Sequence, residues 1–358
     1  MASSLRSIGW SLYAAASWTW CIGMFLPVLL MQWFGWSGFL LVAIPNCLGA
    51  AAMGLFLGSR EASRRFCKRH PVAIAVFIDI TIAFHLLFLF IAALWLAGED
   101  DLPAAGVVWA IVAAYGLSWM PRVMWPWMAV VAFAVGGLVV LECWNLGGAS
   151  GWTGTRPPID VLWFAPVFSL GFVLCPWLDG PFHRARQETD GPAAFLLLGP
   201  LFLCMLLVTA SYWWTQPGSA REIVLVWIFG QSVFTIAANL KERRTLAGVN
   251  HAYPNGIRIG IVLGVLLCTL PLAGASWPGA VDSYIAVLSA YGIAFPAVIL
   301  GWCLPKAPTL TTKGASRFTI LLLVAGAFGI VGFITGPAWV AVIPALLVLT
   351  APWITKAA

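Results

Sequence analysis

Hydrophobic residues in this chain form long, nearly uninterrupted runs that short polar breaks separate, with no regular alternation of apolar and polar positions. Runs of about 20 residues cross a hydrocarbon core of about 30 Å as helices. Helices also satisfy their own backbone polar groups, as lipid requires. The pattern predicts twelve spans, at 8–32, 36–58, 71–97, 104–119, 123–146, 158–178, 192–214, 222–240, 257–275, 281–304, 317–335 and 338–355.

Composition agrees with a membrane protein, since 61% of the residues are hydrophobic and only 9% are charged. Soluble domains carry roughly 25% charged residues. The net charge of +6 does not indicate a nucleic-acid partner, because the basic residues lie in short loops between spans. No short hydrophobic segment with a cleavage site precedes the first span, so we expect no signal peptide.

The basic residues also predict the topology. If the N-terminus is cytoplasmic and each run crosses once, all of the 19 Lys and Arg residues except Arg156 and Arg221 fall on the cytoplasmic side. Cytoplasmic loops of membrane proteins carry this excess of basic residues. We therefore expect a multi-pass cell-membrane protein, of the bacterial inner-membrane type, with both termini in the cytoplasm.

The first and sixth predicted spans share a glycine followed by a proline. These are Gly23 with Pro27, and Gly171 with Pro176. Proline removes a helical hydrogen bond, and glycine tolerates an irregular backbone. Because five spans separate the two starts, the sixth span enters from the opposite side, as in an inverted repeat with two broken helices. Glycine and proline are also common in membrane helices, so chance pairing is the alternative.

This arrangement resembles the LeuT-type fold of the amino acid-polyamine-organocation superfamily. The segment 175–185, CPWLDGPFHRA, is similar to the inner end of a core helix in relatives of the sodium:solute symporters. The resemblance implies an all-α integral membrane protein with one transmembrane domain over 1–358. Five-helix repeats would cover 8–146 and 158–304, and two additional helices 317–355. The chain is shorter than typical members and lacks long external loops.

The resemblance places a solute beside the unwound parts of spans 1 and 6. Aromatic side chains there would wall a small molecule or bind an ammonium group, although tryptophans also serve as packing residues. The candidate substrate-binding residues are Trp18, Thr19, Trp20, Gly23, His85, Phe168, Ser169 and Gly171.

Three ionisable residues lie within or beside the spans, where such groups are costly and often functional. His85 suits proton coupling, a hydrogen bond to the solute, or a structural role. Asp79 is a candidate inner gate or a partner for a loop arginine. Asp179 is a second candidate gate, or part of an interfacial segment.

Span 8 places Ser232, Thr235 and Asn239 on one helical face, at i, i+3 and i+7. Oxygen ligands suit a hard cation, and the resemblance implies a sodium site here, opposite backbone carbonyls of span 1. A polar stripe that joins two helices is the alternative.

Enzyme motifs are absent, and the four histidines show no metal-ligand spacing. We therefore expect a transporter and not an enzyme, with no cofactor other than Na⁺. The expected function is secondary active transport of a small organic solute, coupled to sodium or protons, by alternating access around broken helices. The alternatives are a sensor or subunit that does not transport, a membrane enzyme that uses His85 and Asp79, and a channel. The partners are a solute and the lipid bilayer, and the oligomeric state stays open.

Overall fold

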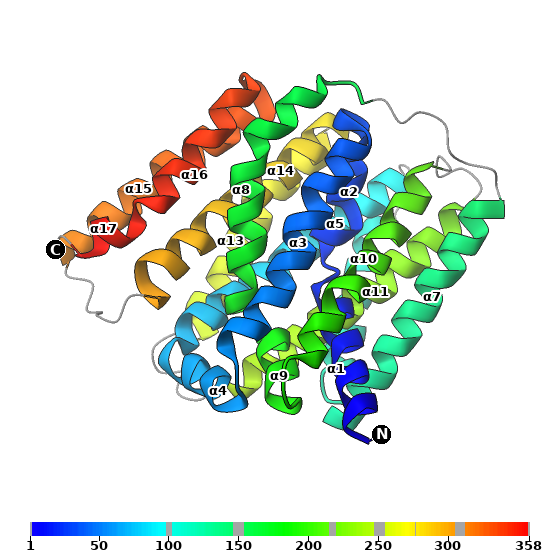
Figure 1. Ribbon diagram of the computed structural model, residues 1–358. Helices are drawn as coiled ribbons and strands as arrows, with labels where there is room; N and C mark the ends of the chain where they lie inside the picture. Colours follow the sequence, from blue (N-terminus) through cyan, green and yellow to red (C-terminus); the bar gives the residue numbers. More distant parts are fainter. Residues whose placement is uncertain are drawn as a thin grey trace.

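The computed structural model describes residues 2–97, 102–145, 154–214, 220–246, 255–275, 277–304 and 312–356, and these contain helices and no strand (Figure 1). The long helices are α1 (Ala2–Trp18), α2 (Cys21–Phe34), α3 (Trp36–Leu57), α5 (Pro71–Ala97), α6 (Leu102–Leu117), α7 (Trp125–Asn145), α8 (Val161–Leu174), α10 (Ala193–Trp214), α11 (Arg221–Thr245), α13 (Asn255–Ala275), α14 (Trp277–Val298) and α15 (Thr312–Ile330). The shorter helices are α4 (Arg60–Arg69), α9 (Gly180–Glu188), α16 (Val342–Leu349) and α17 (Ala351–Lys356), together with the irregular turns η1 (Arg122–Met124), η2 (Pro158–Asp160), η3 (Cys175–Leu178), η4 (Ile299–Cys303), η5 (Val331–Thr335) and η6 (Ala338–Ala341).

Each predicted span corresponds to a helix or to a group of consecutive helices. Within the described residues, nine helices are long and apolar enough to cross a membrane, or ten if the bent pair of α1 and α2 forms one span. Two shorter apolar helices, Ala105–Leu117 and Arg258–Leu267, account for the remaining two spans. The prediction of an all-α, polytopic membrane protein is confirmed.

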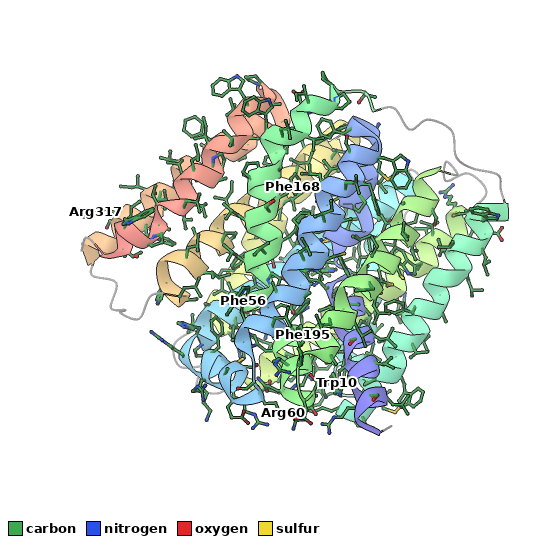
Figure 2. All side chains as sticks on the ribbon, viewed as in Figure 1. Trp10, Phe56, Arg60, Phe168, Phe195 and Arg317 are labelled. Atoms are coloured by element: carbon green, nitrogen blue, oxygen red, sulfur yellow. The ribbon has the colours of Figure 1, made fainter. Side chains whose placement is uncertain are left out.

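The outer surface of the bundle is apolar. Large hydrophobic side chains project outward from its helices (Figure 2), and among them Phe56 is 77% exposed and Trp144 81%. Water would make this surface unfavourable, whereas lipid would cover it without cost. The helix α5 lies deepest in the bundle, while α7 is mostly exposed.

The two halves of the chain pack in corresponding ways. Helix α1 packs against α10 and α7, and α8 packs against α3 and α14. In the same way α11 packs against α6, and α5 packs against α13. Helices α5 and α11 contact each other at the centre (Figure 1). We can match the helices of the two halves in order, α1, α3, α5, α6 and α7 with α8, α10, α11, α13 and α14. Each of these contacts then has a counterpart between the matching helices.

The first span is broken, although not where the sequence predicts. Helices α1 and α2 meet at an angle of 62°, and the break falls at Thr19 and Trp20, where Trp20 is extended. The expected interruption at Gly23 is wrong, because Gly23 and Pro27 both lie within α2. Pro27 cannot donate to the Gly23 carbonyl four residues earlier. The Thr209 hydroxyl donates to that carbonyl instead, at 2.7 Å, so the helix continues.

The sixth predicted span, 158–178, is helical to its end. Helix α8 continues through Gly171, so the expected interruption there is wrong, and the 3₁₀ turn η3 follows it within one apolar segment, Pro158–Leu178. The chain breaks only after this span, at the extended Asp179 that begins α9. Gly171 instead allows close packing, since a Cβ atom there would lie 3.7 Å from the Gly292 Cα of α14. A broken first span and two additional C-terminal helices are features that the LeuT-type resemblance implies, and the structure has them.

The short polar helices α4 and α9 were not predicted. Helix α4 begins at Ser59, whose side chain accepts from the Ala62 N–H, and it carries Glu61 in its first turn and Lys68 in its last. Each of these features stabilises an isolated helix end. Helices α4 and α9 pack on each other, and α9 packs on α1 and α11.

Basic segments predicted to share the cytoplasmic side meet at one end of the bundle. Arg6 pairs with Glu188 of α9 at 2.8 Å, and Lys241 of α11 donates to the Met120 carbonyl at 2.6 Å. Arg156, predicted for the other side, stacks on Trp33 at the far end of α2. Which end faces the cytoplasm stays a prediction.

Candidate functional site

A small, mainly apolar cavity lies beside the break in the first span. It encloses about 40 Å³, which is room for a few water molecules. Its walls come from the break and the first turn of α2, from the middle of α3, from α8 and η3, from α14 and from η5. The lining residues are Trp18, Trp20, Ile22, Gly23, Asn46, Val167, Phe168, Gly171, Phe172, Cys175, Leu288, Ser289, Tyr291, Gly292 and Phe333.

Two tryptophans at the break form one wall of the cavity. The Trp18 and Trp20 ring centroids lie 4.3 Å apart, and Trp20 meets Tyr291 of α14 edge-on at 5.5 Å. Trp18 Nε1 donates to the Asn46 side-chain oxygen of α3 at 2.6 Å. Both rings are almost fully buried. The break therefore holds its aromatic side chains in fixed positions at the cavity.

The cavity has few polar groups and no charged side chain among its lining residues. Among the described residues, Trp20 Nε1 and Ser289 Oγ are buried and have no hydrogen-bond partner, which is costly unless a ligand or water satisfies them. Ile22 and Gly23 belong to the first turn of α2, where backbone N–H groups have no helical acceptor and the helix dipole is positive. The walls therefore suit a mainly apolar molecule that carries a hydrogen-bond acceptor.

Five of the predicted substrate-binding residues line this cavity: Trp18, Trp20, Gly23, Phe168 and Gly171. Figure 2 shows Phe168 on α8. The other three predicted residues do not.

Ser169 follows Phe168 on α8, but its side chain is exposed and faces away from the cavity. Thr19 is buried, and its hydroxyl donates to the Ala15 carbonyl of its own helix at 2.8 Å. Neither side chain lines the cavity.

His85 holds the start of α2. Its Nε2 accepts from the Cys21 N–H at 3.2 Å, and its Nδ1 lies 2.8 Å from the Thr81 carbonyl. The carbonyl only accepts and the N–H only donates, so the ring is neutral with its proton on Nδ1. His85 thus caps the N-terminus of α2 from α5, and it contacts the break without lining the cavity.

The Gln231 side chain joins α11 to the end of α1, the region where the resemblance implies a sodium site. The Gln231 amide nitrogen of α11 donates to the carbonyls of Ala16 and Thr19. It also lies 3.3 Å from Thr235 Oγ1. Two of these oxygen atoms come from the end of α1 and the break, and the third from α11, the two sides between which sodium was expected. Because an amide NH₂ group carries two N–H donors, Gln231 satisfies two of these oxygens at a time and competes with a cation for them. A sodium site here stays a prediction.

The three predicted ion ligands lie on α11 as expected and are fully buried. The Asn239 amide donates to the Thr235 carbonyl at 3.0 Å, within the helix. Ser232 Oγ and the Asn239 side-chain oxygen have no hydrogen-bond partner. Thr235 thus contacts Gln231, the residue that joins α11 to the break, whereas no contact with the break is described for Ser232 or Asn239.

Asp79 is paired with two arginines. Its carboxylate lies 2.8 Å from Arg258 Nε on α13 and 3.5 Å from Arg243 Nε on α11. The pairing with a basic partner was one of the two predicted roles. Because α5 also packs on both α11 and α13, these ion pairs fasten the three helices together. A gating role for Asp79 stays a prediction.

Asp179 lies at the break between η3 and α9, just after the sixth span, and is fully buried. One of its oxygens accepts from the Phe182 N–H at 2.8 Å and caps α9, while the other has no partner among the described residues. Burial raises the pKa of this carboxyl well above its usual value; the Phe182 hydrogen bond opposes the shift, and the nearby Glu242 adds to it. A gating role for Asp179 stays a prediction.

Sequence reasoning missed Asn46, Ser289, Tyr291 and Gln231. Three of them line the cavity, and Gln231 joins α11 to the break. A polar residue within an apolar run was the available signal for Asn46 and Gln231. In the described residues, no group of three or more His, Cys, Asp or Glu side chains could hold a metal ion.

No protein-family model matches this sequence, and no curated protein matches it. One similar solved structure is MhsT in complex with L-phenylalanine, at 13% identity and a TM-score of 0.49; the alignment covers 96% of this chain and 98% of that one. Another is the Eremococcus coleocola manganese transporter in complex with an aromatic bis-isothiourea substituted compound. It is 13% identical with a TM-score of 0.42, and 99% of this chain and 84% of that chain are covered. At sequence identities and TM-scores this low, these similarities do not indicate what the chain binds.

Proposed function

We propose that this chain is a secondary active transporter of a small, mainly apolar organic solute that carries a hydrogen-bond acceptor such as a carboxylate. The observation that carries the proposal is the cavity at the helix break, where Trp20 Nε1 and Ser289 Oγ are buried without partners. Binding sites are typically apolar pockets with a few well-placed polar groups. Here a solute would supply the missing acceptor.

The packing of the helices supports alternating access. The corresponding contacts of the two halves are those expected of inverted five-helix repeats over 8–146 and 158–304, and such repeats place a solute site at their interface. The cavity holds only about 40 Å³ and its aromatic walls are buried. We infer that this conformation is closed, and that the helix breaks allow the cavity to open toward either side.

The contacts of Gln231 bear on the coupling ion. Its amide nitrogen contacts the Ala16, Thr19 and Thr235 oxygens that a sodium ion would use, and its two N–H groups compete with the ion for them. Asp179 offers a buried carboxyl oxygen without a partner, at the second break. Of the two coupling ions expected from the sequence, we therefore propose protons, with Asp179 as the group that binds them.

Uptake into proteoliposomes tests the proposal. The radiolabelled panel should contain apolar amino acids and small aromatic carboxylates, with an imposed proton gradient or an imposed sodium gradient. We expect saturable uptake of at least one solute that the proton gradient drives and the sodium gradient does not. Trp20→Phe removes the indole N–H together with the five-membered part of the ring, and should raise the KM of that solute by at least about two- to tenfold, the usual effect of one hydrogen bond.

Trp125→Phe is the matched control. Trp125 is also buried with its Nε1 unpartnered, but it does not line the cavity, and its replacement should leave the KM unchanged. A panel without uptake by folded protein would contradict transport, and uptake driven by sodium alone would contradict the proposed coupling.

The cavity also suits a transporter-like sensor or subunit, because a small closed pocket can bind a ligand without releasing it on the other side. A solute that raises the melting temperature of the protein, and whose effect Trp20→Phe weakens, would favour this second function if the proteoliposomes show no flux.

A further inference from the structure

A second, larger cleft lies at the end of the bundle that carries α4 and α9. It encloses about 410 Å³, and is formed by α4, η1, α9 and the last turns of α11. The lining residues are Arg64, Cys67, Lys68, Ile74, Arg122, Gly180, His183, Arg184, Gln187, Glu242, Thr245 and Leu246. Neither the solute cavity nor the proposed transport uses it.

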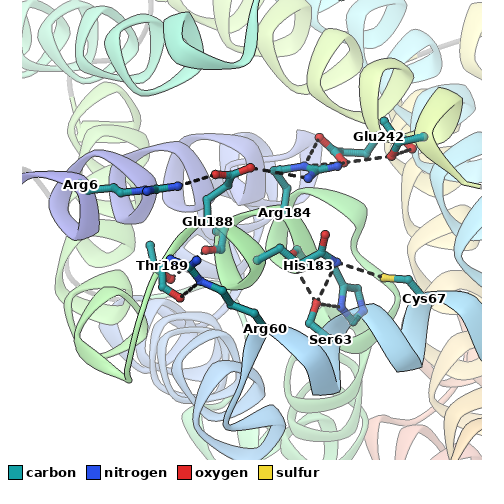
Figure 3. A network of polar contacts seen from close by, with 12 residues as sticks. Arg6, Arg60, Ser63, Cys67, His183, Arg184, Glu188, Thr189 and Glu242 are labelled. Carbon is teal, nitrogen blue, oxygen red and sulfur yellow. Dashed lines mark hydrogen bonds and ion pairs between the residues drawn. The ribbon is translucent and has the colours of Figure 1, made fainter. Parts of the chain in front are cut away.

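The charges around this cleft are unbalanced. Arg64, Lys68, Arg122 and Arg184 line it, and Glu242 is the one carboxylate among the lining residues. Arg184 holds Glu242 with two nitrogens, at 2.9 and 3.0 Å (Figure 3). That pair neutralises the only negative charge of the cleft.

The other three cations have no such partner. Within the described part of the chain, Arg64, Lys68 and Arg122 form no ion pair and no side-chain hydrogen bond. They come from two separate segments, α4 and η1. Three positive charges thus face one space from different sides, and like charges held together repel unless an anion joins them.

The floor of the cleft is rigid and neutral. His183 Nε2 donates to the Trp177 carbonyl at 2.9 Å, and Nδ1 therefore accepts from the Ser63 hydroxyl at 2.9 Å. Burial lowers the pKa of His183 to about 4, so the ring carries no charge at neutral pH. Gln187 donates to Ser63 as well, at 3.1 Å. Figure 3 shows this network tying α4 to α9.

We propose that this cleft binds an anion that carries a phosphate group, with Arg64, Lys68 and Arg122 as its ligands. Guanidinium groups bind phosphate oxygens in pairs, and an ammonium adds a point charge. The volume admits a group the size of a lipid headgroup. The phosphate could belong to an anionic lipid, since basic pockets at the cytoplasmic ends of membrane helices bind such headgroups. It could equally belong to a free phosphate compound.

Binding measurements separate the two sources. Native mass spectrometry of the purified full chain would count bound phosphatidylglycerol, with phosphatidylcholine as the neutral comparison. A parallel measurement would follow the melting temperature in neutral detergent with added pyrophosphate. We expect the protein to retain phosphatidylglycerol over phosphatidylcholine if the source is a lipid, and to be stabilised by pyrophosphate if it is a free anion.

Variants test the residues. Each of Arg64→Gln, Lys68→Gln and Arg122→Gln should weaken binding about fivefold, the effect of one basic side chain near an anionic headgroup. Arg65→Gln is the matched control, because it removes the same charge from the next residue of α4, which does not line the cleft. It should leave binding within about twofold of the wild type. These side chains lie at the surface, so the variants should fold.

Two outcomes would overturn the proposal. One is that the wild type does not retain phosphatidylglycerol over phosphatidylcholine and that pyrophosphate does not raise its melting temperature. The other is that Arg65→Gln weakens binding as much as Arg64→Gln does, which would indicate a diffuse positive surface and no defined site. Both readouts are independent of transport, so a failure of the proposed transport function would leave them interpretable.

Discussion

At the level of single residues, the break in the first span is held by partners on other helices. Trp18 donates to Asn46 of α3, and Trp20 meets Tyr291 of α14 edge-on, so both rings line the cavity. His85 was recognised as unusual, but its partner is the Cys21 N–H of another helix. The order of residues in the sequence does not show which backbone N–H of another helix lacks a hydrogen-bond acceptor.

Gln231 illustrates the same difficulty. The sequence favoured the hydroxyl residues Ser232 and Thr235 as ion ligands, since oxygen atoms suit sodium. The preceding residue on α11 reaches the break instead, and donates to the Ala16 and Thr19 carbonyls. Only the rotation of α11 relative to α1, which tertiary packing sets, decides which of these neighbours faces the break.

The pKa of Asp179 leads to a prediction about pH. Because burial raises this pKa above that of the unfolded chain, the folded state binds the proton more tightly. This stabilisation is complete below about pH 3.9, the pKa of an unfolded aspartate, and is lost as pH rises through the folded pKa. Asp179→Asn keeps the oxygen that accepts from Phe182, but cannot ionise. Its melting temperature should therefore fall less than that of the wild type as pH rises.

Melting curves of the detergent-solubilised protein between about pH 4 and pH 9 would measure this difference, across the range in which a raised carboxyl pKa titrates. Asp282→Asn is the control, since Asp282 is an exposed carboxylate on α14, and its profile should follow the wild type. Parallel profiles for Asp179→Asn and the wild type would rule out Asp179 as a group that takes up a proton.

At the level of helices, apolar runs predicted every span because lipid imposes length and hydrophobicity on each one. The break in the first span was predicted at the wrong residue, and the sixth span is helical to Leu178, so its break comes only after the span. Glycine and proline mark where a helix can bend, whereas the bend itself depends on whether a neighbour replaces the lost hydrogen bond. Thr209 does so for Gly23, and the break moves to Thr19 and Trp20.

Contact between α3 and α8 depends on Gly49. A Cβ atom at this position would lie 2.1 Å from the Phe172 carbonyl oxygen of α8, a backbone atom that cannot move alone. Gly49→Ala should force the two helices apart and destabilise the protein by about 1–3 kcal/mol, as overpacking does. A lower melting temperature in detergent would show this.

Gly116→Ala on α6 is the matched control, because no heavy atom lies within 4 Å of its would-be Cβ. Alanine favours helix over glycine, so this variant should be as stable as the wild type or more stable. If Gly49→Ala has the same melting temperature as Gly116→Ala, then α3 and α8 do not pack as closely as described.

At the level of the whole molecule, the sorting of basic residues anticipated which segments share an end of the bundle. The ion pair of Arg6 with Glu188 and the hydrogen bond from Lys241 to Met120 join segments that lie far apart in the sequence. The sequence could not predict the cleft beside α4, since a short polar helix has no hydrophobic period long enough to stand out from a loop.

The orientation in the membrane can be tested with introduced cysteines. We expect Arg65→Cys of α4 to react with a membrane-impermeant maleimide only after the cells are permeabilised, because the basic end should face the cytoplasm. Thr155→Cys, at the opposite end beside Gln32, should react in intact cells. Labelling of the wild type measures the background from native cysteines, and the reverse pattern would place the basic end outside.

The close pair of Trp18 and Trp20 has an optical consequence. Two indole rings with centroids 4.3 Å apart couple their excited states, and the coupling depends steeply on their separation and mutual angle. Both rings line the solute cavity, so a molecule that enters it must reposition them. The near-ultraviolet circular dichroism of the unlabelled protein should therefore contain a signal that reports, without any attached dye, whether the cavity is occupied.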